Sequence, residues 1–568
     1  MSAPTWTLAD RARALADAAQ GGVELLVVGG GVTGAGVLRD AASRGLRALL
    51  VERDDFASGT SSRSSKMIHG GLRYIAEGQL GVTRESCRER DRLLRLDAHL
   101  VEPLPFLLPA FAGGRYTPWK IAAGLSVYAA LANFRRTARF RMVGAEGALR
   151  FCPSLRREGL RGAGLYSDGQ ADDARVVLET LRSARRLGAA AGAPAEAVHQ
   201  AEVVEFTCDA SGRLRGARVR DRLAGATFAI EAAVVVNAAG PAVERVRGLV
   251  PRASRPELRP AKGVHLVIAA DRIPAAGAVT FEADDGRALF LAPWGEAALL
   301  GTTDAWSDEI DAPAVTIEEV HYLLDAANEA FPGAGLNTND IRAVYAGVRP
   351  LASSQDDGES PPGSVSREDR VWEDATGLIS VVGGKLTTHR AMGERLVDRA
   401  LAKLPRARAA AAGRSRTFEL GLREEALPLD ELAQALRARF GVEPRVADHL
   451  ARRCGAGAEK LLAETPPAEH RAIGGSRHCA AELRWAWRHE CPATLCDLLE
   501  RRTRVALVAA GQGLRELAHL AAVAAEEAGW DDARRAEEMA RYAASVRRHY
   551  QIADPRAARA ASASRRAA

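Results

Sequence analysis

The sequence predicts an α/β protein in which a parallel-sheet domain is interleaved with a separate antiparallel sheet and is followed by an all-helical region. Three observations support this prediction. An apolar run at 25–28 leads through a glycine-rich turn into a helical pattern and a second apolar run at 46–51. Strand-like stretches recur between residues 263 and 300, and helical patterns dominate the chain beyond residue 417.

The glycine-rich turn has the spacing of a nucleotide-binding loop. Gly29, Gly31 and Gly34 match the pattern GxGxxG. The helix predicted over Thr33–Arg44 begins within that pattern, and Glu52 ends the second strand. Such glycines permit a tight turn close to a pyrophosphate, the helix N-terminus stabilises the anion, and the acid accepts hydrogen bonds from a ribose. The combination predicts a Rossmann-like domain that binds a dinucleotide.

A loop rich in small hydroxyl residues and glycine follows the ribose acid. Residues 55–74 read DFASGTSSRSSKMIHGGLRY, where an NAD-binding domain normally enters its next helix. This hydroxyl-rich loop can hydrogen-bond the second, phosphate-bearing half of a dinucleotide and let a flat ring lie against the backbone. A polar surface loop is the alternative, because clusters of serine and glycine are usually loops.

The loop and a series of later motifs resemble those of FAD-dependent, quinone-linked glycerol-3-phosphate dehydrogenases, a family of D-amino-acid-oxidase-like flavoproteins. Within the loop the matching motifs are TSS at 60–62, SSK at 64–66 and HGGLRY at 69–74. The later motifs are YSD at 166–168, DDAR at 172–175, VNAAGP at 236–241, KGVH at 262–265, GTTD at 301–304, GVRPL at 347–351 and GGKLTT at 383–388. The resemblance spans residues 22–400 and, more loosely, residues 481–504.

The resemblance also implies a division into domains. The FAD-binding domain is expected to comprise residues 22–100, 150–250 and 365–402, and the substrate-binding domain residues 101–149 and 251–364. A C-terminal helical domain is expected over residues 417–553. Residues 554–568 form a low-complexity run rich in alanine, arginine and serine, which predicts a disordered tail.

FAD is the cofactor that the resemblance implies, held by the glycine-rich turn, the hydroxyl-rich loop and later strand ends. The expected contacts are Gly29, Gly31, Gly34, Glu52, Thr60, Ser61, Ser62, Lys66, His69, Gly70, Gly71, Val203, Ala239, Gly240, Gly384, Leu386 and Thr387. No metal is expected, and Cys491 and Cys496 lack the CxxC spacing of a metal or redox pair.

A pocket for sn-glycerol 3-phosphate is also implied. Arg73, Tyr74 and Arg367 are expected to hold the phosphate, which forked cationic donors bind well. Arg349 and Lys385 are expected to stabilise an alkoxide at C2. Lys385 follows two glycines at the end of an apolar strand, and ligands bind at the carboxyl ends of strands in such sheets.

The implied reaction is oxidation of sn-glycerol 3-phosphate to dihydroxyacetone phosphate. His265 is the expected base for the C2 hydroxyl, because its ordinary pKa lies near neutrality, while the C2 hydride moves to FAD and electrons pass to a membrane quinone. A core histidine is the alternative reading of His265. Alternative functions are a glycerol-3-phosphate oxidase that forms hydrogen peroxide, another amine or amino-acid oxidase, and a flavin-binding protein without catalysis. Two departures from the family pattern, His389 for tyrosine and Ala171 for valine, bear on the shape of the pocket.

Residues 103–145 combine six basic side chains and several aromatic ones with no aspartate or glutamate. The basic residues are Arg115, Lys120, Arg135, Arg136, Arg139 and Arg141. The apolar run at 121–132 is too short to cross a bilayer, but the segment suits an anionic membrane surface. The resemblance implies a cytoplasmic protein attached peripherally to the inner face of the cytoplasmic membrane. A helix packed on the substrate domain with a solvated basic face is the alternative.

Composition excludes several other classes. The 568 residues carry a formal net charge of +6, which suits anionic ligands but lacks the basic profile of a nucleic-acid-binding protein. Seven scattered cysteines predict reduced thiols in the cytoplasm. Residues 7–20 mix aspartate and arginine, so they do not form a signal peptide. A homodimer is compatible with these features.

Overall fold

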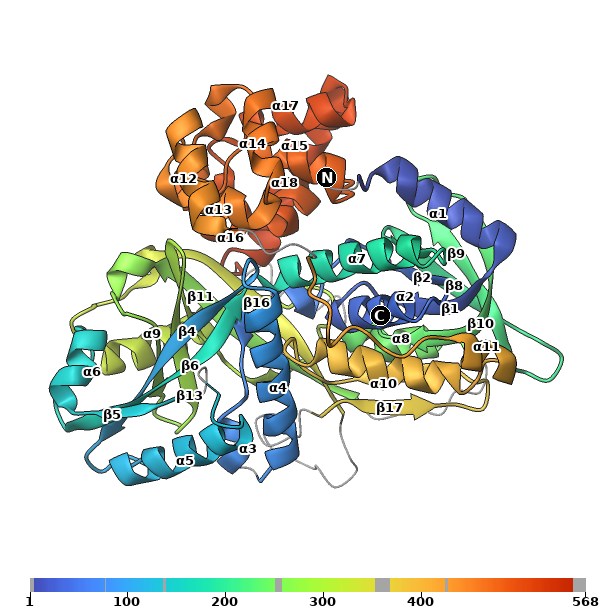
Figure 1. Ribbon diagram of the computed structural model, residues 1–568. Coiled ribbons are helices and arrows are strands. Elements are labelled where there is room, and N and C mark those ends of the chain that lie inside the picture. The colour runs from blue at the N-terminus through green and yellow to red at the C-terminus, as the bar shows by residue number, and fades with distance from the viewer. Residues whose placement is uncertain are drawn as a thin grey trace.

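The computed structural model describes residues 5–76, 78–135, 139–250, 258–352, 368–423 and 428–554. Within these ranges the chain forms two β-sheets with flanking helices and a helical C-terminal domain (Figure 1). The C-terminal helices, orange to red in Figure 1, lie above both sheets. The predicted fold class is therefore confirmed. Arg367 and residues 555–568 of the expected tail lie outside the described ranges.

The first sheet has strand order β17-β18-β10-β1-β2-β7. These strands are β1 (Val23–Val28), β2 (Ala48–Val51), β7 (Ala195–Val198), β10 (Thr227–Asn237), β17 (Arg370–Glu373) and β18 (Ile379–Val382). Strand β1 is central and runs parallel to both β2 and β10, with Leu26 opposite Leu49 on one side and Val235 on the other. Because such strands are covered on both faces, their apolar runs are nearly continuous. An antiparallel ribbon of β8 (Ala201–Cys208) and β9 (Leu214–Asp221) extends β10.

Helices cover this sheet at positions that the sequence specifies. They are α1 (Leu8–Gly21), α2 (Val32–Ser43), α7 (Asp173–Ala190), α8 (Val243–Arg247) and α10 (His389–Leu401). Helices α2 and α10 cross at glycines, since a Cβ on Gly36 would lie 2.5 Å from the carbonyl oxygen of His389, and one on Gly393 would lie 2.4 Å from Gly36 backbone. The His389 side chain is buried, and its Nδ1 donates to the Leu386 carbonyl oxygen at 2.8 Å. This departure from tyrosine therefore lies at a helix contact.

The second sheet has strand order β15-β11-β14-β13-β12-β4-β6-β3, with β16 paired to β11 and β5 paired to β6. Its strands are β3 (Met67–Ile68), β4 (Val101–Phe111), β5 (Arg141–Val143), β6 (Leu160–Ala171), β11 (Leu258–Ala269), β12 (Ala278–Glu282), β13 (Ala288–Trp294), β14 (Ala297–Gly301), β15 (Ala305–Trp306) and β16 (Ile341–Ala352). All pairs are antiparallel among the described strands except β4 with β12. The predicted antiparallel sheet is thus present. Helices α6 (Ala145–Phe151) and α9 (Ile317–Ala330) pack against it.

One expected domain boundary is wrong. Strand β6 falls within residues 150–250, which were expected in the FAD-binding domain, but it pairs with β4 along its whole length in the second sheet. The chain returns to the first sheet only at Asp172, whose carboxylate accepts from the backbone N–H groups of Ala174 and Arg175 and caps α7. Strand β6 has alternating burial but several glycines, so local pattern did not reveal which sheet it joins.

In the basic segment 103–145, the described residues form the end of β4, helix α5 (Pro118–Leu131) and strand β5, whereas Arg136 lies outside the described ranges. Helix α5 buries Ile121, Leu125 and Tyr128 and exposes Trp119 and Val127. Helix α3 (Arg73–Ala76) begins at the end of the hydroxyl-rich loop, and helix α4 (Leu80–Leu96) precedes β4 in sequence. Among the helices that the structure describes, none has the length and apolarity needed to cross a bilayer.

The C-terminal domain is built from helices, and those from α15 onward pack on the second sheet. The helices of the domain are α12 (Leu429–Phe440), α13 (Pro444–Cys454), α14 (Gly457–Glu464), α15 (Ala481–His489), a π-helical turn at Asp497–Arg502, α16 (Val505–Val508), α17 (Leu517–Ala528) and α18 (Asp532–His549). Helix α11 (Arg406–Ala411) lies beside the first sheet, where Arg408 pairs with Glu24 (Figure 1). One apolar cluster joins Val267, Trp294 and Tyr345 of the sheet to helical side chains such as Leu498 and Tyr542. This domain is therefore packed on the sheet through a shared core.

Candidate active site

A cavity of about 730 Å³ opens at the carboxyl ends of the first sheet's parallel strands. Residues from the first sheet, the hydroxyl-rich loop and the C-terminal domain line it. The predicted cofactor residues among its walls are Gly29, Gly31, Glu52, Thr60, Ser61, Val203, Ala239, Gly240, Gly384 and Leu386. Residues that are more than 350 positions apart in sequence thus line one cavity.

The glycines of the turn have distinct physical roles. Gly29 has φ +116°, and a Cβ there would lie 2.6 Å from the carbonyl oxygen of Ala238. A Cβ on Gly34 would lie 2.0 Å from the carbonyl oxygen of Gly29, so this position holds helix α2 close to strand β1. Gly34 therefore supports the turn from behind and is absent from the described lining of the cavity.

Glu52 lies where a ribose acid is needed. Its Oε2 accepts from the Gly30 N–H at 2.6 Å, and its Oε1 accepts from the Asp54 N–H at 2.8 Å. Burial raises the pKa of Glu52 to about 7, although these backbone donors act in the opposite direction. The carboxylate is thus fixed in place at the cavity wall, with lone pairs left to accept hydroxyl groups.

The hydroxyl groups of the loop bind protein as well as facing the cavity. Ser61 Oγ accepts from the Val32 N–H at 3.0 Å, at the start of helix α2. Thr60 Oγ1 donates to the carbonyl oxygen of Val348 in strand β16. The turn at 60–62 therefore connects the anion-binding end of α2 to the strand that carries Arg349.

Lys66 holds the loop from behind. Its side chain is fully buried, and Nζ lies 2.8 Å from Asp173 Oδ1 and 3.1 Å from the Ser62 carbonyl oxygen. Asp173 Oδ2 also accepts from the Ser64 N–H and hydroxyl, at 3.0 and 2.7 Å. Lys66 and Ser62, which were expected to contact FAD, are therefore outside the described lining of the cavity, and Lys66 stabilises the loop.

Two predicted motifs, HGG and GGKLTT, are bound to each other. The His69 N–H donates to Thr387 Oγ1 at 3.1 Å, and that hydroxyl donates to the His69 carbonyl oxygen at 3.3 Å. A Cβ on Gly70 would lie 2.3 Å from the hydroxyl of Tyr128, and one on Gly71 would lie 2.1 Å from the ring of Tyr74. His69, Gly70, Gly71 and Thr387 thus shape the region next to the cavity and are outside its described lining.

A buried polar cluster beneath the HGG turn was not anticipated. Asp168 Oδ1 accepts from the Tyr128 hydroxyl at 2.6 Å, from Arg90 NH1 at 2.5 Å and from the Gly70 N–H at 3.2 Å. Burial and the Asp168 charge raise the pKa of Tyr128 well above its ordinary value, so its hydroxyl remains a donor. The YSD motif had marked Asp168 in the sequence, but its partners come from helices α4 and α5, which no local pattern connects to it.

Two of the predicted catalytic residues lie on neighbouring strands, His265 on β11 and Arg349 on β16. His265 stacks on Tyr345 with ring centroids 4.8 Å apart, and its Nε2 lies 2.8 Å from Ser65 Oγ. Its Nδ1 is buried without a hydrogen-bond partner among the described residues. Burial, with the charges of Arg349 and Lys66, lowers the pKa of His265 well below its ordinary value. The imidazole is therefore neutral at neutral pH and retains a free ring nitrogen.

Arg349 and Lys385 are each held in one orientation by neighbouring side chains. Arg349 NH1 donates to Asp304 Oδ1 at 2.8 Å, and its NH2 donates to Thr302 Oγ1 at 3.2 Å. Asp304 and Thr302 belong to the GTTD motif, which the resemblance had noted without assigning a role. Lys385 lines the cavity, and its Nζ lies 3.2 Å from Ser86 Oγ.

Tyr74 and Arg73 are the remaining predicted substrate residues that the structure describes. Lys385 Nζ lies 3.7 Å from the centroid of the buried Tyr74 ring, which is cation–π geometry. The guanidinium of Arg73 lies 5.9 Å from the same centroid, and its side chain is exposed. Arg73, Tyr74 and Lys385 therefore form a cationic group at the edge of the cavity.

Comparisons with known proteins agree with this geometry. The family model described as FAD dependent oxidoreductase matches residues 24–399, and that of the C-terminal domain of alpha-glycerophosphate oxidase matches residues 420–535. The aerobic glycerol-3-phosphate dehydrogenase of Staphylococcus aureus strain USA300 is 39% identical over 377 residues, which are 66% of this chain and 66% of the relative.

Solved structures extend the similarity over the whole fold. The glycerol-3-phosphate dehydrogenase from Bacillus halodurans complexed with FAD has a TM-score of 0.76 and 30% identity, covering 96% of this chain and 98% of that one. The L-alpha-glycerophosphate oxidase from Mycoplasma pneumoniae with FAD bound shares the fold at a TM-score of 0.51 and 18% identity, covering 66% and 94%. The glycine turn, Glu52 and the loop fit FAD, which is the cofactor of this chain.

The raised pKa of Glu52 predicts a pH-dependent affinity for FAD. A ribose hydroxyl donates to the carboxylate, so FAD binding favours the deprotonated form and must displace a proton below pH 7. The FAD dissociation constant should therefore rise as pH falls from 7 to 5, by up to about tenfold per unit. Flavin fluorescence titrations would measure it.

The Glu52→Gln variant should bind FAD with an affinity that is nearly independent of pH. The matched control is Glu202→Gln, which should keep the pH dependence of the parent. Glu202 lines the same cavity but pairs with Arg220. An FAD affinity of the parent that is flat between pH 5 and 8 would contradict the assignment of Glu52 as the ribose acid.

Proposed function

The chain belongs to the FAD dependent oxidoreductase family, and from that premise we propose that it oxidises sn-glycerol 3-phosphate to dihydroxyacetone phosphate. The observation that carries the proposal is the cluster of Lys385, Tyr74 and Arg73, of which Lys385 lines the cofactor cavity. Arg349 lies next to Pro350, which lines the same cavity. A phosphorylated polyol needs such cations, whereas an amino acid needs a carboxylate clamp and an apolar pocket. The names of the relatives support the same substrate.

When bound, FAD supplies the hydride acceptor. His265 is neutral, and we assign it as the base that accepts the proton of the C2 hydroxyl. Its lowered pKa makes it a weak base, so the alkoxide that develops at C2 needs stabilisation by nearby cations. Arg349 and Lys385 supply it, and their partners Asp304 and Ser86 fix their orientation in advance. The exposed guanidinium of Arg73 binds the phosphate.

The electron acceptor that we propose is a membrane quinone, because the surface of segment 103–145 suits a lipid interface. Trp119 and Phe134 are 69% and 71% exposed, and Val127 and Met142 are also exposed. Lys120 Nζ lies 5.9 Å from the Trp119 ring, and Arg115 lies 5.4 Å from the Tyr116 ring. Aromatic side chains next to basic ones are characteristic of the headgroup region of a membrane. The protein would accordingly attach to the cytoplasmic face of the membrane.

Replacing Arg349 by alanine should lower kcat/KM for sn-glycerol 3-phosphate at least about tenfold, because a charge-assisted hydrogen bond contributes about 1.5–3 kcal/mol. FAD content should be unchanged. Arg342→Ala is the matched control, since Arg342 lies on the same strand with similar exposure but donates to the Glu296 carbonyl oxygen. Steady-state kinetics with a soluble dye acceptor would decide, and an unchanged kcat/KM for Arg349→Ala would remove this residue from the site.

The identity of the electron acceptor can be tested by measuring which acceptor is reduced. With sn-glycerol 3-phosphate as donor, the protein in lipid vesicles should reduce a ubiquinone analogue and form little hydrogen peroxide in air. Quinone absorbance and a peroxide assay on the same sample would measure the two products. Peroxide that accounts for most of the substrate oxidised, even with quinone present, would establish the oxidase alternative.

Membrane attachment should depend on the exposed aromatic residues. Burying one such side chain in the interface contributes about 1.5–3 kcal/mol, so a Trp119→Ser, Phe134→Ser double variant should bind anionic vesicles at least about tenfold more weakly. Leu223→Ser is the control, because Leu223 is 45% exposed but lies in a hairpin far along the chain. Sedimentation at low and high salt would measure binding, and equal pelleting of parent and double variant would refute this surface as the attachment site.

A further inference from the structure

The C-terminal domain binds the hydroxyl-rich loop on both sides of its cavity-lining turn. Before the turn, Asp55 Oδ2 accepts from Arg501 Nε at 2.5 Å and from Arg502 NH1. After it, Arg504 NH2 donates to the Ser62 carbonyl oxygen at 2.8 Å and lies 3.5 Å from Asp173 Oδ1. Three arginines from four consecutive residues therefore contact the segment that lines the cofactor cavity.

These contacts are buried ion pairs. The Arg502 and Arg504 side chains are 0% and 2% exposed, and that of Asp55 is 2% exposed. Burial acts to raise the pKa of Asp55, but Arg502 and Arg501 hold it below its ordinary range, so the carboxylate is charged. Removing one member of such a pair leaves an uncompensated charge away from water. The loop position is thus sensitive to each arginine.

The same part of the domain reaches the cavity itself. Arg501 and Glu500 lie in the π-helical turn and line the cavity, together with Ser545 and His549 of helix α18. π-Helical turns are rare and are frequent at functional sites. Arg63 of the hydroxyl-rich loop donates to His549 Nδ1 at 3.2 Å, which adds a contact between the loop and α18.

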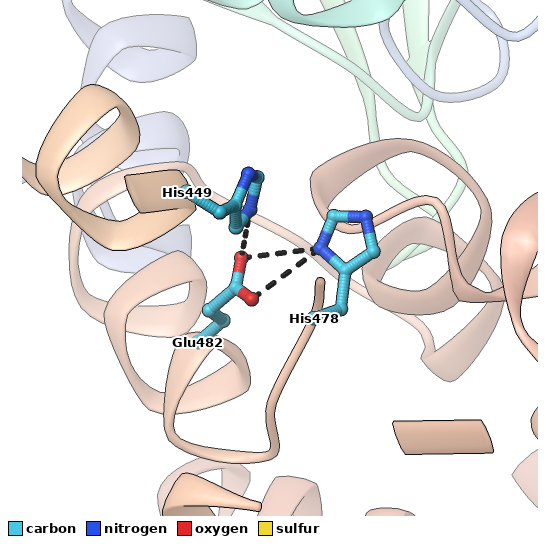
Figure 2. Close-up of side chains that lie close together, drawn as sticks. All are labelled: His449, His478 and Glu482. Atoms are coloured by element: carbon cyan, nitrogen blue, oxygen red, sulfur yellow. Dashed lines mark hydrogen bonds and ion pairs between the residues drawn. The ribbon is translucent and has the colours of Figure 1, made fainter. Parts of the chain in front are cut away.

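A histidine–glutamate network fixes Arg504 from within the C-terminal domain. Figure 2 shows His449 and His478 directed at Glu482. His449 Nε2 lies 2.9 Å from Glu482 Oε2, and His478 Nδ1 lies 3.3 Å from Oε1. On the other side of its ring, His478 Nε2 accepts the backbone N–H of Arg504 at 3.2 Å.

Two histidines and a carboxylate suggest a metal centre, but their partners argue against one. Because His478 Nε2 accepts a hydrogen bond, the ring proton is on Nδ1, so the nitrogen that faces Glu482 is a donor rather than a ligand. Arg453 also binds Glu482 Oε2, which would place a guanidinium beside the cation. Both ring nitrogens of His478 have partners within the C-terminal domain, and the result is a fixed backbone at Arg504.

We propose that Arg501, Arg502 and Arg504 are positioning residues for FAD, and that the C-terminal domain completes the cofactor site. By fixing Asp55 and Ser62 they hold the turn between them, where Ser61 binds the N-terminus of α2 and Thr60 binds strand β16 next to Arg349. The arginines thereby set the position of the loop relative to both cofactor and substrate residues. The inference concerns FAD and does not depend on the identity of the substrate.

The test compares Arg504→Met and Arg504→Lys with Arg484→Met in the full-length holoprotein. Arg484 pairs with Glu469, Glu526 and Glu527, all within the C-terminal domain. The readouts are the FAD dissociation constant, the visible flavin spectrum and the flavin midpoint potential, none of which requires substrate. Both methionine variants should have a lower thermal unfolding temperature than the parent, so their comparison controls for a general loss of stability.

Arg504→Met should raise the FAD dissociation constant at least about tenfold and alter the flavin spectrum, since charged hydrogen bonds are lost behind the loop. Arg504→Lys keeps the positive charge but lacks the forked guanidinium. Its FAD dissociation constant should lie between those of Arg504→Met and the parent. Arg484→Met should leave FAD affinity and spectrum unchanged. If Arg504→Met does not fold, Arg504→Lys decides alone. A folded Arg504 variant with the parent's affinity, spectrum and potential would overturn the proposal.

Discussion

The fold depends on the buried carboxylate of Asp173, at which three parts of the chain meet. It is the first residue of helix α7, accepts from the Ser64 backbone and hydroxyl, and pairs with Lys66 and Arg504. Its side chain is fully buried, as is that of Lys66. Breaking a buried pair by removing one member costs about 3–5 kcal/mol, so loop, helix and C-terminal domain are joined in one conformation.

This arrangement explains how the cofactor cavity is connected to the proposed substrate residues. The first sheet provides the glycine turn and Glu52, whereas the second sheet provides His265 and Arg349. The hydroxyl-rich loop runs between them and is bonded to both, through Ser61 at α2 and Thr60 at β16. A preorganised site of this kind needs little rearrangement when charge develops at the substrate.

The local sequence pattern was sufficient to predict the structure where the function requires a particular local backbone geometry. The spacing of Gly29 and Glu52 identified the strand–turn–helix–strand unit, because only that local arrangement satisfies a dinucleotide. The structural role of Lys66 could not be predicted in this way, because a lysine in a hydroxyl-rich loop is equally typical of a residue that contacts a ligand. Its burial is set by Asp173, more than 100 residues later. The partners of Arg349 and Asp168, and the sheet that β6 joins, likewise depend on long-range pairing that no periodicity records.

The most direct test of the account is anaerobic addition of sn-glycerol 3-phosphate to the purified holoprotein while the flavin absorbance is followed. The account predicts that the oxidised flavin band is bleached and that dihydroxyacetone phosphate forms in an amount stoichiometric with FAD. An oxidised flavin band that persists with sn-glycerol 3-phosphate, or one that is bleached by an amino acid instead, would contradict it.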